Sequence, residues 1–103
     1  MPKHVVVTYA VRPEAKAEHV QLIERVFTQL QAEHPDDVDY QVLCLADGVS
    51  FVHVSSHDTV DGVNPLPKLA AFIDFSRDIA DRVATPPVAA EALSVGRYRG
   101  LVV

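Results

Sequence analysis

The feature of this sequence that most constrains its fold is a tight turn near the middle. Asp47-Gly48 separates two strand-like runs, Asp39 to Ala46 and Ser50 to Ser56. An Asp-Gly pair between such runs is a strong β-hairpin signal, because glycine readily adopts the positive φ that short hairpin turns require. The two runs are therefore expected to pair as antiparallel strands.

A strand and then a helix are predicted before this hairpin. From Lys3 to Arg12 apolar residues largely alternate and β-branched types are frequent, which is typical of a strand. Pro13 suits the first turn of a helix, and apolar residues then recur at spacings of three and four as far as Leu30. The pattern predicts an amphipathic helix that ends near His34, before Pro35.

A loop, a helix and a fourth strand are predicted after the hairpin. The segment His57 to Pro67 has no periodicity and is interpreted as a long loop. Helical spacing predicts a helix from Lys68 to Ala84, ended by Pro86 and Pro87. Alternation then predicts a strand from Ala92 to Tyr98.

This order of elements predicts the α+β class. Strand, helix, strand, strand, helix, strand with one tight hairpin fits the ferredoxin-like βαββαβ plan. We expect an antiparallel four-stranded sheet in the order 4-1-3-2, with both helices on one face. At 103 residues, the chain from 1 to 103 is expected to form a single domain.

The other face of the sheet is predicted to be partly apolar. One set of alternating residues is assigned to the helix side: Val5, Val7, Tyr9, Val52, Val54, Leu93 and Val95. The opposite set is Val6, Thr8, Phe51, His53, Ser94 and Tyr98. A face of this kind usually marks an interface, so we expect a homodimer with sheet against sheet, across which Leu101-Val102-Val103 could dock.

Composition excludes several classes of protein. The net charge of −5 and the lack of clustered Lys and Arg argue against nucleic acid as a partner. The single Cys44 cannot form an internal disulfide and is expected to be a small buried hydrophobe. No signal-peptide core or membrane span is visible, so we expect no membrane partner and a cytoplasmic location.

Several segments resemble a known family. Val5 to Pro13, Gly48 to His53, and Pro86-Pro87-Val88 leading into Val95 to Tyr98 are similar to the dimeric α/β-barrel superfamily, and most of all to its antibiotic biosynthesis monooxygenase-like proteins. The resemblance covers nearly the whole chain, and it rests on pattern and spacing. It therefore implies fold more directly than activity.

The resemblance implies a dimer whose sheets face each other and a pocket in each subunit between sheet and helices. The characterised oxygenases of this group act on polyphenolic substrates without metal or flavin, and related members degrade haem. Both activities use a Trp, usually with an Asn on the first strand. This sequence has no Trp, and Thr8 or Tyr9 stands where that Asn might be.

Two residues are the candidates for catalysis. His53 has an imidazole that could act as a general base, although a hydrogen-bonded interface histidine is the structural alternative. Tyr9 could position a carbonyl or phenolic ligand, or could be a core ring. The candidates for substrate binding are Tyr40, Phe72, Phe75 and Arg97. The two phenylalanines could equally be plain core, and Arg97 could face Asp74 or Asp78, an anionic ligand, or solvent.

No metal or cofactor is expected. His53 and His57 lie four residues apart, about 13 Å along an extended strand at roughly 3.3 Å per residue, which is too far to share one zinc ion. Asp58, Asp61 and Asn64 lack the spacing of a calcium loop. Phosphate-loop, H-E-x-x-H and serine-elbow motifs are missing from the sequence.

Three functions stay open at this point. The leading hypothesis is a cofactor-independent monooxygenase that acts on a small aromatic or polyketide-like compound. The second is a dimeric protein without catalysis that binds a small hydrophobic ligand or has a structural or stress-related role. An isomerase of related fold is the third.

Overall fold

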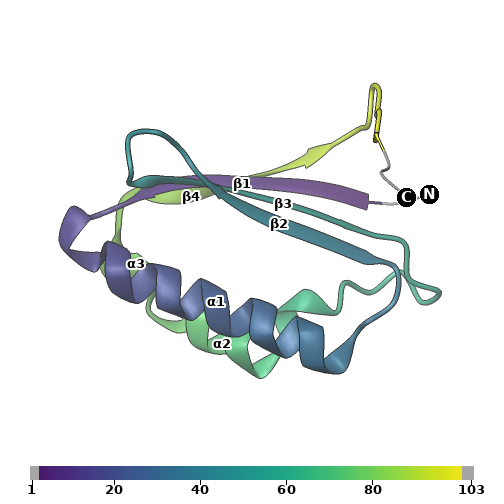
Figure 1. The fold of residues 1–103 in the computed structure, drawn as a ribbon, viewed down its shortest axis with the longest axis horizontal. Coiled ribbons are helices and arrows are strands. Elements are labelled where there is room, and N and C mark those ends of the chain that lie inside the picture. The colour runs from purple at the N-terminus through teal and green to yellow at the C-terminus, as the bar shows by residue number, and fades with distance from the viewer. Residues whose placement is uncertain (1–2, 101–103) are drawn as a thin grey trace.

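A computed structural model that describes residues 3–100 shows two layers, a sheet and helices on one of its faces (Figure 1). The antiparallel sheet has the order β2-β3-β1-β4, with β1 (Lys3–Val11), β2 (Val38–Cys44), β3 (Ser50–His57) and β4 (Val83–Ala92). The helices are α1 (Lys16–Glu33), α2 (Ala70–Arg77) and α3 (Ile79–Arg82), with short 3-10 turns η1 (Pro13–Ala15) and η2 (Leu66–Lys68). The predicted ferredoxin-like fold and sheet order are confirmed.

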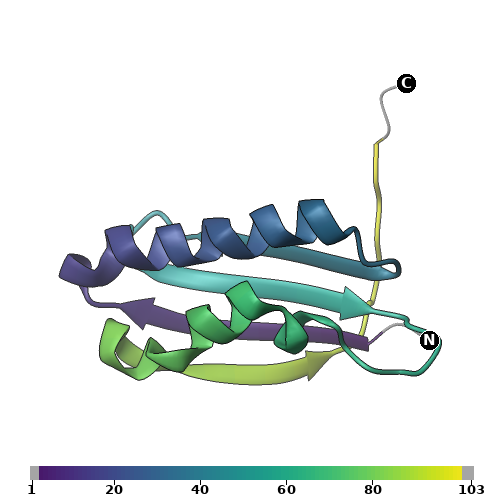
Figure 2. The same cartoon turned by 90° about the horizontal axis from the view of Figure 1, so that it is seen from below.

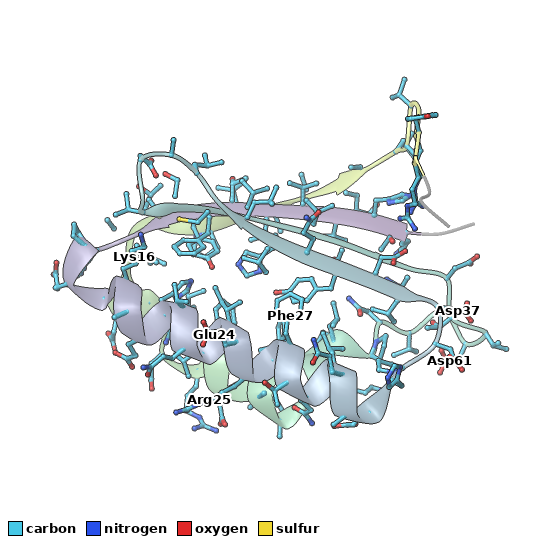
Figure 3. All side chains as sticks on the ribbon, in the orientation of Figure 1. Lys16, Glu24, Arg25, Phe27, Asp37 and Asp61 are labelled. Carbon is cyan, nitrogen blue, oxygen red and sulfur yellow. The ribbon has the colours of Figure 1, made fainter. Side chains whose placement is uncertain are left out.

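The helix α1 follows its amphipathic pattern. Its predicted end is confirmed, because His34 adopts the left-handed conformation (φ 48°) and donates its backbone N–H to the carbonyl of Leu30 at 2.8 Å. In Figure 3 Phe27 points from α1 toward the sheet, whereas Arg25 points away from it. Figure 2 shows α1 and α2 side by side over the same face of the sheet.

The central hairpin is confirmed. Gly48 adopts a φ of +80°, and the side chain of Asp47 accepts hydrogen bonds from the backbone N–H groups of Val49 (3.0 Å) and Ser50 (2.8 Å). Gly48 therefore supplies the positive φ of the turn, and Asp47 accepts hydrogen bonds from its backbone. The strands β2 and β3 pair antiparallel on either side of the turn.

The predicted position of the last strand is wrong. The strand β4 spans Val83–Ala92 and contains Pro86 and Pro87, which had been interpreted as a stop. These prolines are accommodated because β4 is an edge strand and its pairing with β1 shifts register between Thr8 and Ala10. Proline lacks an N–H and is tolerated at edges and irregularities of this kind. Residues 93–100, predicted as strand in part, form no strand.

The predicted second helix is also broken into shorter pieces. Instead of one helix from Lys68 to Ala84, the structure has η2, α2 and α3. Asp78 interrupts the path with φ −118° and ψ 27°, outside the helical region. The chain then turns directly into β4, so Val83 and Ala84 belong to the sheet.

The assignment of faces was right for β1 and wrong for β3. Tyr9 pairs with Phe51, and the ring stacking of these two side chains on the helix side fixes the parity of both strands. His53 lies on the helix side too, buried, which excludes the interface histidine alternative. Val52 and Val54 therefore lie on the open face. Alternation could not decide this, since both sides of β3 carry apolar side chains.

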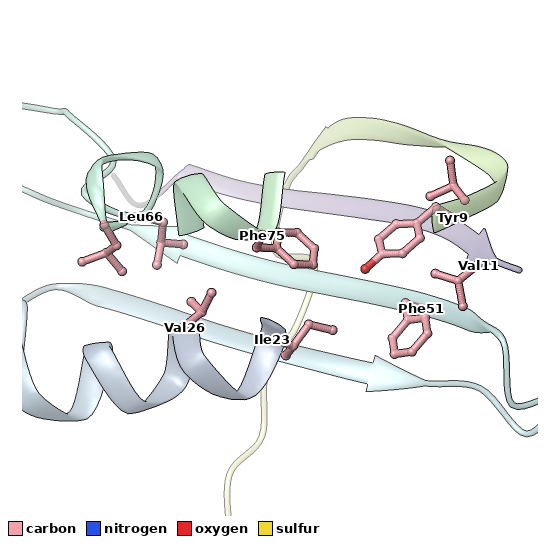
Figure 4. Close-up of a cluster of buried hydrophobic side chains, with 9 residues drawn as sticks. Tyr9, Val11, Ile23, Val26, Phe51, Leu66 and Phe75 are labelled. Carbon is pink, nitrogen blue, oxygen red and sulfur yellow. The ribbon is translucent and has the colours of Figure 1, made fainter. Parts of the chain in front are cut away.

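The core lies between the sheet and the helices. Figure 4 shows its cluster of buried side chains, drawn from both strands and helices. The buried members are Tyr9, Val11, Ile23, Val26, Phe51, Leu66, Leu69, Phe75 and Val83. Cys44 was expected there, and this is wrong: its side chain is exposed, at the end of the edge strand β2.

Beyond β4 the chain leaves the body of the protein. In Figure 1 the segment after β4 projects on the side of the sheet opposite the helices. The proposed docking of Leu101-Val102-Val103 lies outside the described residues. Within residues 3–100, no helix is both long and apolar enough to cross a membrane, and the cytoplasmic location stays a prediction.

Candidate ligand-binding site

A cavity of about 250 Å³ lies between the sheet and α2. It is lined by apolar and aromatic side chains with a few polar groups: Val5, Val7, Tyr9, Tyr40, His53, Ser55, Asn64, Leu66, Pro67, Phe72, Phe75, Ser76 and Ile79. An apolar cavity of about 150 Å³ holds benzene. This pocket therefore suits a compound of one or two rings.

Five of the six predicted site residues meet at this pocket. Tyr9 comes from β1, Tyr40 from β2 and His53 from β3, while Phe72 and Phe75 come from α2. Strands far apart in sequence supply the polar atoms, and the helix supplies the aromatic wall. Their roles in binding and catalysis remain predictions.

Arg97 is not part of this pocket. It is exposed, beyond β4, and lines a more open hollow of about 450 Å³ together with Val6, Gln41 and Val54. Those three residues belong to the face of the sheet without helices. Of the environments considered for Arg97, the structure shows solvent.

Three polar side chains of the pocket and two buried ones behind them form a continuous row of hydrogen bonds. The Tyr9 hydroxyl lies 2.5 Å from Nε2 of His19 and 2.6 Å from Nε2 of His53. The other nitrogen of His53, Nδ1, lies 2.6 Å from the Tyr40 hydroxyl. At the far end, Nε of Arg82 donates to Nδ1 of His19 at 3.0 Å. We call these five side chains the Tyr–His row.

Sequence reasoning missed two members of this row, His19 and Arg82. Both are buried, although histidine and arginine usually reach the surface. His19 lies four residues before the buried Ile23 on α1, and Arg82 continues the helical spacing of Phe75 and Ile79. A polar residue on an apolar stripe was the available signal.

Burial keeps the Tyr–His row uncharged apart from Arg82. Desolvation, with the nearby positive charge of Arg82, lowers the pKa of His19 to about 4. Desolvation alone lowers the pKa of His53 to about 4. It also raises the pKa of Tyr9 and of Tyr40 above the usual phenol value. Both imidazoles and both phenols are therefore neutral at pH 7.

Aromatic packing holds the row in place. The Tyr40 ring stacks on Phe27 with centroids 5.2 Å apart and an interplanar angle of 9°. Tyr9 stacks on Phe51 at 5.8 Å, and His53 lies 5.6 Å from Phe75. Figure 4 shows the Tyr9 hydroxyl directed into the cluster, toward Phe75. Rings fixed in this way present a polar atom to a ligand at little entropic cost.

Arg82 is a buried cation without a carboxylate partner in residues 3–100. Its guanidinium donates to the backbone carbonyl of Phe75 as well as to His19, and it lies 5.4 Å from the centroid of the Phe75 ring. Burying a charge costs free energy unless hydrogen bonds compensate. Arg82 therefore depends on these hydrogen bonds for its place in the core.

The described part of the chain contains no group of three or more His, Cys, Asp or Glu arranged to hold a metal ion. What the site offers instead is a neutral hydrogen-bonding group, the Tyr40 hydroxyl, beside an apolar cavity with aromatic walls. That combination can orient a flat ligand and hydrogen-bond to one of its oxygen atoms.

Comparison with solved structures identifies the fold. The protein Rv0793 from Mycobacterium tuberculosis superposes with a TM-score of 0.76 at 16% identity, covering 96% of this chain and 100% of that one. A "putative antibiotic biosynthesis monooxygenase" from Nitrosomonas europaea gives 0.74 at 17%, covering 91% and 90%. The chain has the antibiotic biosynthesis monooxygenase-like fold. The resemblance inferred from sequence is confirmed at this level.

A protein of the same name from Caulobacter crescentus gives a TM-score of 0.71 at 20% identity, covering 92% of this chain and 91% of that one. All three identities are low, so these likenesses concern the fold alone. No family model matches the chain, and no curated protein matches it in sequence.

Proposed function

We propose that this protein binds a small, flat aromatic compound bearing an oxygen atom, and oxidises it with molecular oxygen as a cofactor-independent monooxygenase. The single observation that carries the proposal is the buried Tyr–His row, of which Tyr9, His53 and Tyr40 line an otherwise largely apolar pocket. The names of two structural neighbours, from Nitrosomonas europaea and Caulobacter crescentus, support oxygenation as the reaction class.

The reaction balances without another reductant. A phenol loses hydrogen from one ring carbon and from its hydroxyl, and one atom of molecular oxygen becomes the new carbonyl while the other leaves as water. Tyr40 would hold the substrate oxygen, and Phe72 and Phe75 would flank the ring. His53 has both ring nitrogens in hydrogen bonds, so we assign it to positioning Tyr40.

One observation favours a second candidate, a ligand-binding protein without catalysis. The neutral Tyr–His row contains no free base, since each imidazole nitrogen of His19 and His53 already has a partner. A binding protein needs only the pocket and its hydrogen bond, whereas an oxygenase must also promote reaction with oxygen.

We also propose that a second copy of the chain covers the open face of the sheet. That face exposes Leu43, Val54 and Val88, and the segment beyond β4 leaves Leu93 88% and Val95 100% exposed. Apolar side chains gathered on one face are typical of an interface. The proposal rests on this exposed face.

Calorimetry and oxygen uptake on the full chain test the function. We expect dihydroxynaphthalene to bind and to be oxidised with stoichiometric oxygen uptake. His53→Ala should lower turnover about 100-fold, because Tyr40 loses the partner that positions it, and the control Tyr98→Phe, at an exposed tyrosine, should not. Binding without oxygen uptake would favour the second candidate. Unchanged turnover in His53→Ala would remove the Tyr–His row from the reaction.

A further inference from the structure

The hydrogen bonds of the Tyr–His row all run the same way from donor to acceptor, and Arg82 determines that direction. A guanidinium is always protonated and can only donate hydrogen bonds. Its Nε lies 3.0 Å from Nδ1 of His19, so Nδ1 must be the nitrogen that carries no proton. Because His19 is neutral at pH 7, its one proton is on Nε2.

This assignment propagates through the row. His19 donates from Nε2 to the oxygen of Tyr9, which leaves the Tyr9 hydroxyl free to donate to Nε2 of His53. His53 is neutral and accepts at Nε2, so its proton is on Nδ1 and is donated to the oxygen of Tyr40. His19, Tyr9 and His53 therefore each donate one hydrogen bond and accept one.

Only the proton of Tyr40 is left over. In residues 3–100 the Tyr40 hydroxyl has no hydrogen-bond partner other than His53, and Tyr40 lines the pocket. Its O–H group is therefore available to a ligand. Its oxygen, which already accepts from His53, is the poorer partner for a ligand that donates.

Reversing the row would leave a buried group unpaired. If Tyr40 donated to His53, then His53 and His19 would both donate to Tyr9, whose own proton would have no acceptor. Tyr9 is 5% exposed, so water cannot easily replace that acceptor. An unsatisfied buried donor costs about 10-fold to 100-fold in an equilibrium constant.

We infer that the pocket binds quinone carbonyls and phenolates more tightly than neutral phenols, because their oxygen accepts a hydrogen bond from Tyr40. Arg82 is the remote positioning residue that sets this preference. The inference rests on the proposed function, since it needs an aromatic ligand in the pocket. Beyond that function, it specifies which protonation state of the ligand is preferred and why.

The bound pKa of para-nitrophenol tests this inference, because its anion has its own absorption band. An apolar pocket alone would raise the pKa of a bound phenol by disfavouring the anion. We expect the reverse, a pKa lowered by one unit or more on binding, which corresponds to a tenfold or greater preference for the phenolate. Naphthoquinone should compete for the same site.

Matched variants separate the causes. Tyr40→Phe keeps the charge of Arg82 but removes the donor, so the bound pKa should rise above that of free para-nitrophenol. Arg82→Lys keeps a donor-only cation and should behave as the parent protein, whereas Arg82→Gln can accept as well as donate and should lose the preference. Tyr98→Phe is the control. Circular dichroism checks that each variant is folded.

Nitrogen NMR of the two imidazoles supplies a readout independent of ligand and of variants. The free protein should show His19 as the Nε2–H tautomer and His53 as the Nδ1–H tautomer. Finding His53 with its proton on Nε2 would overturn the inference, as would a bound pKa that is raised in the parent protein or still lowered in Tyr40→Phe. If neither naphthoquinone nor para-nitrophenol binds at all, the proposed function fails, while the tautomers still decide the direction of the row.

Discussion

The hydroxyl of Tyr9 lies 2.6 Å from Nε2 of His53, although the two residues are 44 positions apart. They meet because β1 and β3 are neighbours in the sheet and Tyr9 and His53 both point toward the helices. This contact joins the arginine end of the Tyr–His row to the end that reaches the pocket. Its loss should affect stability as well as ligand binding.

Tyr9→Phe should lower the free energy of unfolding by about 2–4 kcal/mol, because the N–H of His19 and the acceptor nitrogen of His53 both lose a buried partner. Urea denaturation followed by circular dichroism measures the change. Tyr98→Phe is the control, since Tyr98 is 93% exposed and its change should stay within about 0.5 kcal/mol. Equal values for the two variants would contradict the energetic importance of the row.

The free energy of unfolding should fall as the pH drops from about 6.5 to about 4. His19 and His53 have a pKa near 4 in the folded protein and an ordinary pKa of about 6.5 when unfolded. The unfolded state therefore binds more protons in this window, and the loss is up to about 1.4 kcal/mol per pH unit for each histidine. Below pH 4 the effect should level off.

Urea titrations at several pH values measure this slope. His53→Gln removes one of the two contributions and should reduce the slope by about half, whereas Tyr98→Phe, which changes no imidazole, should leave it unchanged. A parent protein whose stability does not vary between pH 6.5 and 4 would mean that the two imidazoles are not held neutral.

Val54→Glu should convert the proposed dimer to a monomer without unfolding it. Val54 lies on the open face, next to the other exposed apolar side chains, so a carboxylate there would have to be buried against the second copy. Ile73→Glu, an exposed position on α2, is the matched control. Light scattering gives the mass, and a parent protein with the mass of one subunit at micromolar concentration would disprove the dimer.

Gly48→Ala should cost about 1–2 kcal/mol, the usual price of a left-handed conformation for a residue with a Cβ atom. Gly48 has a φ of +80°, and an added Cβ would lie 3.5 Å from Nζ of Lys16, an ordinary contact, so the backbone alone sets the cost. A Cβ atom added at Gly96 would have no neighbouring atom within 4 Å, so Gly96→Ala should hardly change the free energy of unfolding. Thermal denaturation of both variants checks this, and a Gly48→Ala protein as stable as Gly96→Ala would contradict it.

Local signals made much of this fold predictable. The alternation in β1, the apolar spacing and proline start of the first helix, and the Asp47-Gly48 turn each act over a few residues. Together they determine the order of elements, and from that order the topology follows. Tyr9, His53 and Tyr40 could be selected as candidates from the chemistry of their hydroxyl and imidazole groups, but the face assignment put His53 opposite Tyr9, and only the structure brings the three to one pocket.

The features that were missed depend on contacts between distant segments. Pro86 and Pro87 indicate a break when they are considered alone, and only the edge position of β4 and its shifted register make a strand compatible with them. The orientation of β3 was ambiguous because valines lie on one side and Phe51 and His53 on the other. Nothing near His19 in the sequence shows that Arg82, 63 residues away, donates to it.

The same pair of prolines limits how molecules of this protein can assemble. A strand at the border of a sheet normally offers a row of backbone N–H and C=O groups to which a foreign strand can add, the first step toward fibres. Pro86 and Pro87 have no N–H and lie in the middle of β4, where its pairing with β1 is irregular. A foreign strand would have to pair with this interrupted segment, which disfavours growth of the sheet past β4 and favours contact through flat faces as the route for copies to meet on that side.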